Sequence, residues 1–333
     1  MPGCRRENWE MHTQYLAAFG LAAFALVSTS CTKPEEQVPI DKVSAQALFG
    51  SDPLTDKVDN PGTPEKVALG KLLYHDKSLS KGGDIACASC HDLGTFGVDN
   101  QPTSPGTGGT LGGRNTPSSL NASRHFVQFW DGRAKNVEEQ ATGPVLNPKE
   151  HGVKDEAELV ALLARNPATV AAFQTAYPGD TSPVTVKNFQ LAIGAFERTL
   201  ATRSRFDDFV EGKDAALTTA EKKGLKTFME VGCTACHMTR LVGGSQFRKL
   251  GEVVPFESKD LGRYEVTKQD VDRMMFKVPS LLNVAKTAPY FHDGSVATLD
   301  QAIKLMGKHQ LGKNLADDQV AAIATFLGSL TGK

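Results

Sequence analysis

The sequence predicts an all-α fold of two similar domains, with long irregular loops between the helices. Apolar residues recur at helical spacing along much of the chain, and no segment alternates apolar and polar residues as a half-buried strand would. The 333 residues are enough for two domains of ordinary size. A Cys-x-x-Cys-His motif occurs twice, and its histidines, His91 and His237, lie 146 residues apart, which indicates a duplicated unit.

The composition is that of a folded globular protein, with 40% hydrophobic and 23% charged residues. The 37 lysines and arginines nearly balance the 38 aspartates and glutamates, and no run of like charge stands out. Binding to nucleic acids or anionic membranes usually requires a basic patch, which this pattern does not contain. The charge pattern therefore predicts no nucleic-acid partner.

Residues 1–30 have the features of a secretory signal peptide. No charged residue occurs from Met11 to Thr32, and the apolar segment from Tyr15 to Val27 has the length of a signal-peptide core but is short for a membrane-spanning helix. Arg5 and Arg6 precede it, and small residues follow it. A buried N-terminal helix is the alternative interpretation, and a start at Met11 is also open.

Cys31 comes directly after the small residues and is followed by a polar segment, Thr32 to Glu36, an arrangement similar to a bacterial lipoprotein site. Ser28 departs from that pattern, so lipid attachment at Cys31 and ordinary cleavage both stay open. The signal predicts a periplasmic chain in either case, tethered to the membrane if Cys31 is lipidated.

Two helices are predicted in the first half of the mature chain. Thr63 and Pro64 are typical of a helix start, and Pro183 is predicted to begin the second helix. Apolar residues follow each start at spacings of three and four and predict core-facing sides. They are Leu69, Leu72 and Leu73 in the first helix, and Val186, Phe189, Ile193, Phe196 and Leu200 in the second.

Three helices are predicted in the second half. Thr218-x-x-Glu221 is a capping box for a helix that ends at Gly232, directly before the second Cys-x-x-Cys-His motif. Thr298-x-x-Gln301 begins another helix, and an apolar stripe marks the last one. The apolar faces are Leu299, Ile303 and Met306 in the former and Val320, Ile323, Leu327 and Leu330 in the latter.

Both Cys-x-x-Cys-His motifs are typical of covalent c-type haem attachment, in which the cysteines bond to the porphyrin and the histidine binds iron. Disulfides are the alternative, but the histidine after each pair argues against them. Export agrees with haem c, which is attached outside the cytoplasm. We therefore predict cytochrome c-like domains over residues 40–203 and 204–333, each with one haem. The six ligating or attaching residues are Cys87, Cys90, His91, Cys233, Cys236 and His237.

The segment from Gly94 to Asn121 lacks regular periodicity and contains a glycine-rich stretch, Pro105 to Gly113. A phosphate-binding loop would need a preceding strand and a Gly-Lys-Ser/Thr ending, and neither is present. We predict a mobile loop beside the first haem.

Several motifs together resemble the bacterial dihaem cytochrome c peroxidases, a family that also includes the dihaem enzyme maturing tryptophan tryptophylquinone. The resemblance covers most of the mature chain and implies a peroxidatic haem in the N-terminal domain and an electron-accepting haem in the C-terminal domain. Its motifs here are Cys87-Ala-Ser-Cys-His-Asp-Leu-Gly94, Gly97-Val-Asp-Asn100, Arg114-Asn-Thr-Pro117, Gln128-Phe-Trp-Asp-Gly-Arg133, Asn147-Pro-Lys-Glu150, Pro279-Ser-Leu-Leu-Asn283 and Ala288-Pro-Tyr-Phe-His-Asp-Gly294.

The resemblance implies roles for four further residues. Met306 matches the methionine ligand of the electron-transfer haem, where the tryptophylquinone-maturing enzyme has a tyrosine. Glu150 matches the catalytic glutamate, which would move a proton between the two oxygens of H2O2, and Gln140 its companion glutamine. Trp130 matches a tryptophan between the haems, an electron relay. Judged from residue type alone, Met306 and Trp130 would be core residues and Glu150 a solvated surface residue.

Asn115, Thr287 and Pro289 match the family's calcium site, which uses one side-chain oxygen, backbone carbonyls and water. Such neutral residues would otherwise be assigned to turns.

One position departs from the family. Many members have a second histidine sixteen residues after the first attachment histidine, where it caps the peroxidatic iron until the other haem is reduced. This chain has Thr107 there, which is not a plausible haem ligand. His125 or His151 are the possible substitutes, although each has the simpler interpretation of an ordinary histidine near the site.

These expectations describe a periplasmic homodimer that reduces H2O2 to water with electrons from a small c-type cytochrome or a cupredoxin. Two alternatives remain. A dihaem oxidase acting on a protein partner is favoured by Thr107 and disfavoured by Met306. A plain dihaem electron carrier would need both irons six-coordinate and would leave Glu150 without a task.

Overall fold

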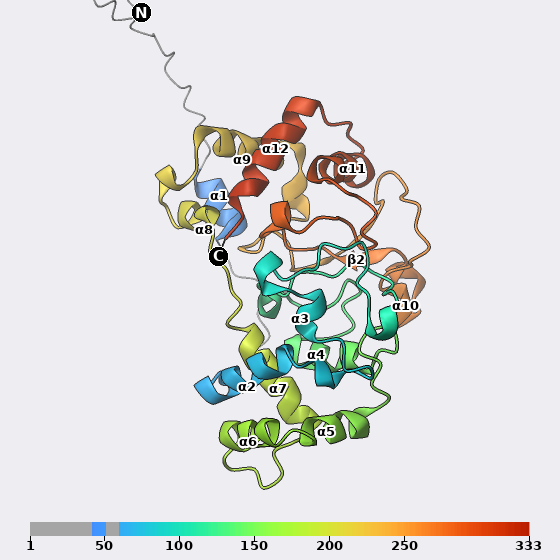
Figure 1. Ribbon diagram of the computed structural model, residues 1–333. Coiled ribbons are helices and arrows are strands. Elements are labelled where there is room, and N and C mark those ends of the chain that lie inside the picture. The colour runs from blue at the N-terminus through green and yellow to red at the C-terminus, as the bar shows by residue number, and fades with distance from the viewer. Residues whose placement is uncertain (1–41, 51–59, 333) are drawn as a thin grey trace, which may run out of the picture. The chain divides into compact units, whose positions relative to one another are not determined.

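The computed structural model describes residues 42–50 and 60–332, in which helices form nearly all of the regular structure (Figure 1). The predicted signal peptide and Cys31 lie outside the described residues. Within these ranges, the structure departs from an all-α fold at a short antiparallel ribbon of β1 (Phe247–Lys249) and β2 (Met275–Lys277). Strands of three residues are too short for alternation to appear in the sequence. No helix in the described ranges is long and apolar enough to span a bilayer.

One group of helices packs around a first hydrophobic core. At its centre, Gly70 brings two helices together, because a Cβ atom there would lie only 2.0 Å from the Ala192 carbonyl oxygen. Leu69, Leu73 and Ile193 are buried beside this crossing. The helices of the group are α2 (Pro64–Tyr74), α4 (Val137–Leu146), α5 (Glu156–Ala164), α6 (Pro167–Ala176) and α7 (Val186–Glu197).

A second group repeats this arrangement. Gly224 allows a close helix crossing as Gly70 does, since a Cβ atom there would lie 2.1 Å from the Ala322 carbonyl oxygen. In both groups, therefore, the helix preceding a Cys-x-x-Cys-His motif crosses a later helix at a glycine, as a duplicated unit would. The helices of the second group are α1 (Lys42–Phe49), α8 (Arg205–Val210), α9 (Thr219–Val231), α11 (Leu299–Leu311) and α12 (Asp317–Ser329).

The helix starts follow the local signals in the sequence. The capping box of Thr218 and Glu221 forms at α9, and Gly232 ends that helix with φ of 106°. Two details differ from the prediction. α7 begins at Val186 because the Thr185 side chain caps it by accepting a hydrogen bond from the Asn188 N–H. Leu72 is 39% exposed, so the core face of α2 is narrower than its three leucines suggested.

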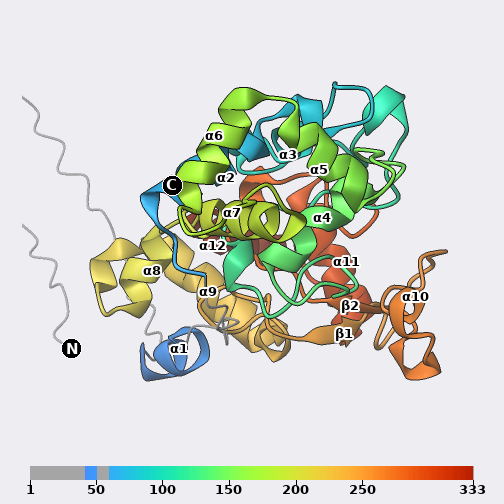
Figure 2. The same cartoon turned by 90° about the horizontal axis from the view of Figure 1, so that it is seen from below.

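The two hydrophobic cores draw on different parts of the chain, and the division into two domains stays a prediction. The first core draws its buried residues from positions 69–196 and the second from positions 206–330. α1 is the exception, because Ala45 and Phe49 are buried in the second core, and the Phe49 ring meets Phe206 at 5.3 Å between centroids. The predicted first domain, residues 40–203, therefore contains a helix that packs with the second core. Figure 2 shows α2, α5, α6 and α7 together and α1 near α8 and α9.

Irregular segments connect the two halves at several backbone contacts. The Phe126 N–H donates to the Gly244 carbonyl at 3.1 Å, and the Lys277 N–H donates to the Trp130 carbonyl at 2.8 Å. The Arg114 guanidinium forms ion pairs with Asp131 and Asp260, both at 2.6 Å. Segments that are far apart in sequence are thereby brought to one region of the molecule.

Candidate functional site

The first Cys-x-x-Cys-His motif is held by α2 and by the chain that follows it. Its cysteines form the single-turn helix α3 (Cys87–Cys90), and the buried Tyr74 hydroxyl donates to the His91 carbonyl at 2.7 Å. The His91 Nδ1 lies 3.3 Å from the Gly97 carbonyl oxygen. A carbonyl only accepts hydrogen bonds, so Nδ1 carries the proton and Nε2 has a free lone pair. Burial lowers the pKa of His91 and so favours this neutral form.

The second motif has the same chemistry. It begins where α9 ends, and the His237 Nδ1 lies 3.1 Å from the Val242 carbonyl oxygen. Burial lowers the pKa of His237 to about 4, so this ring is also neutral with its Nε2 lone pair free. A ring oriented through Nδ1 by a backbone carbonyl is the usual state of a histidine that binds a metal through Nε2.

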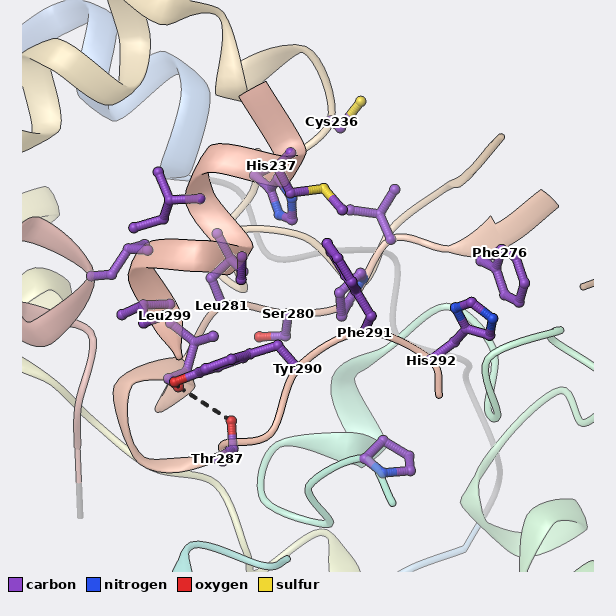
Figure 3. Close-up of a pocket in the computed structure, with 18 of the residues that line it drawn as sticks. Cys236, His237, Phe276, Ser280, Leu281, Thr287, Tyr290, Phe291, His292 and Leu299 are labelled. Atoms are coloured by element: carbon purple, nitrogen blue, oxygen red, sulfur yellow. Dashed lines mark hydrogen bonds between the residues drawn. The ribbon is translucent and has the colours of Figure 1, made fainter. Parts of the chain in front are cut away.

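A largely apolar cavity adjoins the second motif (Figure 3). Its walls include the thiols of Cys233 and Cys236, the His237 ring and the thioether of Met306 on α11. Figure 3 shows Phe291, Tyr290 and Leu299 among the aromatic and aliphatic side chains of the wall. Two thiols, an imidazole with a free nitrogen and a thioether in an apolar enclosure are a donor set that fits haem c.

Glu150 lies just after α4 and close to the first motif. The Asn147 side-chain amide donates to its Oε1 at 2.6 Å. Burial raises the pKa of Glu150, while the hydrogen bond from Asn147 and the charge of Arg133 act in the opposite direction. Burial is also the main cause of the raised pKa values of Cys87 and Cys90, and the Glu150 carboxylate contributes at both thiols. The structure therefore brings a half-buried carboxyl group to the first motif.

The glycine-rich loop packs directly on the Glu150 segment. A Cβ atom on Gly106 would lie 2.1 Å from the Lys149 carbonyl oxygen, so only glycine permits this approach. The Thr107 N–H donates to the Glu150 carbonyl at 2.7 Å, and its hydroxyl donates to Asp84 at 2.8 Å. Thr107 thus fixes the loop through its backbone and its side chain together.

Gln140 and Trp130 lie in different parts of the structure. Gln140 belongs to the helix before Glu150, and Trp130 lies at the cavity beside the second motif. Gln140 is half-buried in the second turn of α4, the helix that leads to Glu150, and the described hydrogen bonds do not join their side chains. Trp130 lies on the wall of the cavity beside the second motif, and its indole N–H donates to the Asn115 carbonyl at 2.9 Å. Trp130 comes from the first half of the sequence and so connects that half to the second motif.

The three residues predicted to bind calcium line this same cavity. The Asn115 side-chain nitrogen donates to the carbonyls of Gln101 and Pro102, at 3.0 and 3.3 Å. Thr287 directly precedes the cis peptide bond that joins Ala288 to Pro289. The described ranges contain no cluster of three or more His, Cys, Asp or Glu side chains suited to a metal ion. A calcium site here would depend on neutral oxygens, and it remains a prediction.

The two substitute histidines lie in different places. His151 is buried, its Nδ1 is 2.9 Å from the Leu79 carbonyl oxygen, and its charge acts on His91. His125 lines the cavity of the second motif, where its Nδ1 is 3.1 Å from the Lys277 Nζ. Lys277 and Arg133 were not predicted as site residues. Arg133 lies in one of the family motifs, but nothing in the sequence distinguishes Lys277.

Comparisons with known proteins agree with this geometry. Residues 64–215 match the family model described as di-haem cytochrome c peroxidase. The chain is 44% identical over 300 residues to the cytochrome c551 peroxidase of Pseudomonas aeruginosa, covering 87% of this chain and 86% of that protein. It is 34% identical over 248 residues to the methylamine utilization protein MauG of Methylorubrum extorquens, covering 73% and 69%. A solved MauG-like protein associated with microbial copper homeostasis superposes with a TM-score of 0.74 at 27% identity, covering 90% of this chain and 95% of that one.

Proposed function

Because this chain belongs to the di-haem cytochrome c peroxidase family and is therefore an oxidoreductase, we propose that it reduces H2O2 to water in the periplasm. The electrons would come from a small c-type cytochrome or a cupredoxin. The observation that carries the proposal is the half-buried Glu150 carboxyl beside a motif whose histidine has a free Nε2. Peroxide cleavage requires a proton acceptor within hydrogen-bond reach of the position where peroxide binds.

Family membership implies two haems. Cys87, Cys90 and His91 would hold the first, and the second would be held by Cys233, Cys236, His237 and Met306. Bound haem supplies a redox-active iron that can bind peroxide at the first site and store an electron at the second. The apolar cavity and the neutral histidines support this assignment.

The side chains of the protein would handle protons and orientation. Glu150 would take a proton from one oxygen of H2O2 and return it to the departing oxygen, while the Asn147 amide holds the carboxyl in place. Gln140 would orient the peroxide. Trp130, on the wall of the cavity beside the second motif, would relay electrons between the two halves.

Further proposals rest on the family resemblance and on sequence motifs. They are calcium at Asn115, Thr287 and Pro289, a homodimer, two cytochrome c-like domains, and a lipid anchor at Cys31. The two cores and the repeated glycine crossings support the two domains.

The alternative is an oxidase that withdraws electrons from a protein partner. Thr107 in place of the loop histidine favours it. Met306 in the cavity of His237 and the higher identity to the P. aeruginosa peroxidase than to MauG favour the peroxidase.

We expect two covalent haems per chain, because both motifs present two thiols and a neutral histidine. A pyridine haemochrome assay on purified protein of known concentration measures this number. Changing both Cys233 and Cys236 to Ser should lower it to one. A value of one in the unaltered protein would contradict the assignment of the second site.

Replacing Met306 by His should lower the reduction potential of the C-terminal haem, because a basic nitrogen favours ferric iron more than a thioether does. Spectroelectrochemical titration measures the change. Met229→Leu is the matched control, since Met229 packs against the second core from α9. A potential unchanged by Met306→His would move the sixth ligand elsewhere.

A further inference from the structure

His125 and Lys277 form a buried pair in the wall of the C-terminal cavity. Their exposed fractions are only 8% and 5%, respectively. The Lys277 Nζ lies 3.1 Å from the His125 Nδ1 and 3.3 Å from the Val127 carbonyl oxygen. The pair joins the two halves of the sequence, because Lys277 belongs to β2 and its backbone N–H donates to Trp130.

This contact fixes the proton of the His125 ring. A lysine ammonium has three donors and no acceptor, so the Lys277 Nζ donates and the His125 Nδ1 accepts. The ring therefore carries its proton on Nε2. The Nε2 atom is buried and has no hydrogen-bond partner in the part of the chain that the structure describes. A buried N–H donor without an acceptor is costly, which indicates that an acceptor belongs there.

The pair also lacks a directly bound anion. Asp131 is the carboxylate whose charge acts on Lys277, but it forms ion pairs with Arg114 at 2.6 Å and Arg133 at 2.9 Å. Arg124 places a further positive charge near His125. Within the described ranges, no carboxylate lies within 4 Å of the Lys277 ammonium. This part of the cavity wall thus presents an unpaired N–H donor beside a buried cation.

We infer that the His125–Lys277 pair binds a propionate carboxylate of the haem attached at Cys233 and Cys236. The inference rests on the proposed function only for the presence of that haem. A carboxylate would accept the Nε2–H of His125 and neutralise the ammonium.

The other basic side chains on this wall are engaged elsewhere. In haem c, the propionates lie on the edge opposite the two thioether links. Arg248 lies close enough to the Cys236 thiol for its charge to oppose the effect of burial on the thiol pKa, and so it belongs to the thioether edge. The His292 Nε2 lies 3.2 Å from the Ser258 hydroxyl, and its ring packs on Phe276, as Figure 3 shows. His125 and Lys277 are therefore the basic side chains of this wall that can contact the propionate edge of the haem.

The His125–Lys277 pair and His237 are close to adjacent residues of one loop. A Cβ atom on Gly243 would lie 3.3 Å from the His237 Nδ1, and one on Gly244 would lie 3.0 Å from the His125 Cδ2. The rings of His237 and His125 therefore both lie close to the same short loop. The charge of the pair should therefore act on the C-terminal haem and stabilise the electron that it accepts.

The test is spectroelectrochemical titration of the haem-loaded protein. For one charge lost roughly 10 Å from the haem at an effective dielectric constant of about 20, Lys277→Met should lower the ratio of reduced to oxidised C-terminal haem about tenfold at fixed applied potential. Lys277→Arg, which keeps the charge, should stay within about twofold of the unaltered ratio. His125→Leu should lower the ratio by a smaller factor and shift the propionate carboxylate band in the redox-difference infrared spectrum.

Lys286→Met is the matched control, because Lys286 is an exposed lysine of the same half and its loss should leave the ratio unchanged. The inference is overturned if Lys277→Met and His125→Leu both keep the unaltered ratio and carboxylate band. If Lys277→Met does not incorporate haem, His125→Leu alone decides. The proposed function fails separately, through absent peroxide turnover in a protein whose potentials still respond to these substitutions.

Discussion

Glu150→Gln is expected to slow the reaction with H2O2 by about 10² to 10⁴, the usual contribution of a positioned acid-base group. Glutamine has the same shape and can still accept the hydrogen bond from Asn147, but it cannot take up a proton. Peroxide should therefore still reach the first site, and the loss should appear in the cleavage step. Rapid mixing of the haem-loaded protein with H2O2, followed by absorbance, measures the rate.

Glu150 should also determine how the rate of reaction with H2O2 falls at acidic pH. Only the ionised carboxylate can accept a proton, and burial raises the pKa of Glu150 above that of an ordinary glutamate. The rate should therefore fall on acidification, at a pH above the pKa of an exposed glutamate. This step should be absent in Glu150→Gln.

Two comparisons make the Glu150 prediction specific. Glu156→Gln changes an exposed glutamate six residues further along and should leave the rate unchanged. Gln140→Ala should slow the reaction less than the Glu150 change, because water can partly replace an orienting amide. Glu150→Gln with the unaltered rate would show that the proton acceptor is another group.

Thr107→His is expected to close the first haem site in the oxidised protein. With Thr107, no loop histidine is available as a ligand, so the oxidised N-terminal haem should be high-spin and react with H2O2 without prior reduction. The loop lies against the Glu150 segment through the hydrogen bond from the Thr107 N–H. If the new imidazole closes 99 of every 100 molecules, the rate with oxidised protein should fall about 100-fold, and reduction of the other haem should restore it.

Thr107→Val separates ligation from loop anchoring. Valine has the size of threonine but cannot donate to Asp84, so it tests the side-chain anchor without adding a ligand. The oxidised Val variant should still react with H2O2. If the unaltered oxidised protein shows a low-spin electron paramagnetic resonance signal for the first haem and no reaction, the site is closed by another ligand. His151, which lies near His91, would be the first residue to test.

Features that depend on neighbours in sequence were predictable. The capping box of Thr218 and Glu221 and the end of α9 at Gly232 depend on residues a few positions apart, and the structure confirms them. The exposure of Leu72 was not predictable, because the packing of α2 against α7 decides which of its leucines are buried. The β1–β2 ribbon is too short to leave a pattern, and its pairing joins Phe247 to Lys277.

The same distinction between local and long-range features applies to the candidate site. Each Cys-x-x-Cys-His motif is a contiguous run of residues, so haem attachment could be predicted from the sequence. The anchoring of Thr107 by Asp84 and the contact of His125 with Lys277 join residues 23 and 152 positions apart, and no local pattern marks them. The mobility predicted for the glycine-rich loop stays a prediction, although Gly106 packs closely on Lys149. Long-range contacts of this kind are set by the tertiary fold.

Consumption of H2O2 by the haem-loaded protein in the presence of a reduced small c-type cytochrome tests the proposed peroxidase activity most directly. Each H2O2 takes two electrons and two protons to give two molecules of water. We therefore expect two cytochrome molecules to be oxidised for each H2O2 consumed, with turnover strongly reduced in Glu150→Gln. If the reduced cytochrome passes electrons to the protein but H2O2 is not consumed, the chain is an electron carrier and the proposed function is wrong.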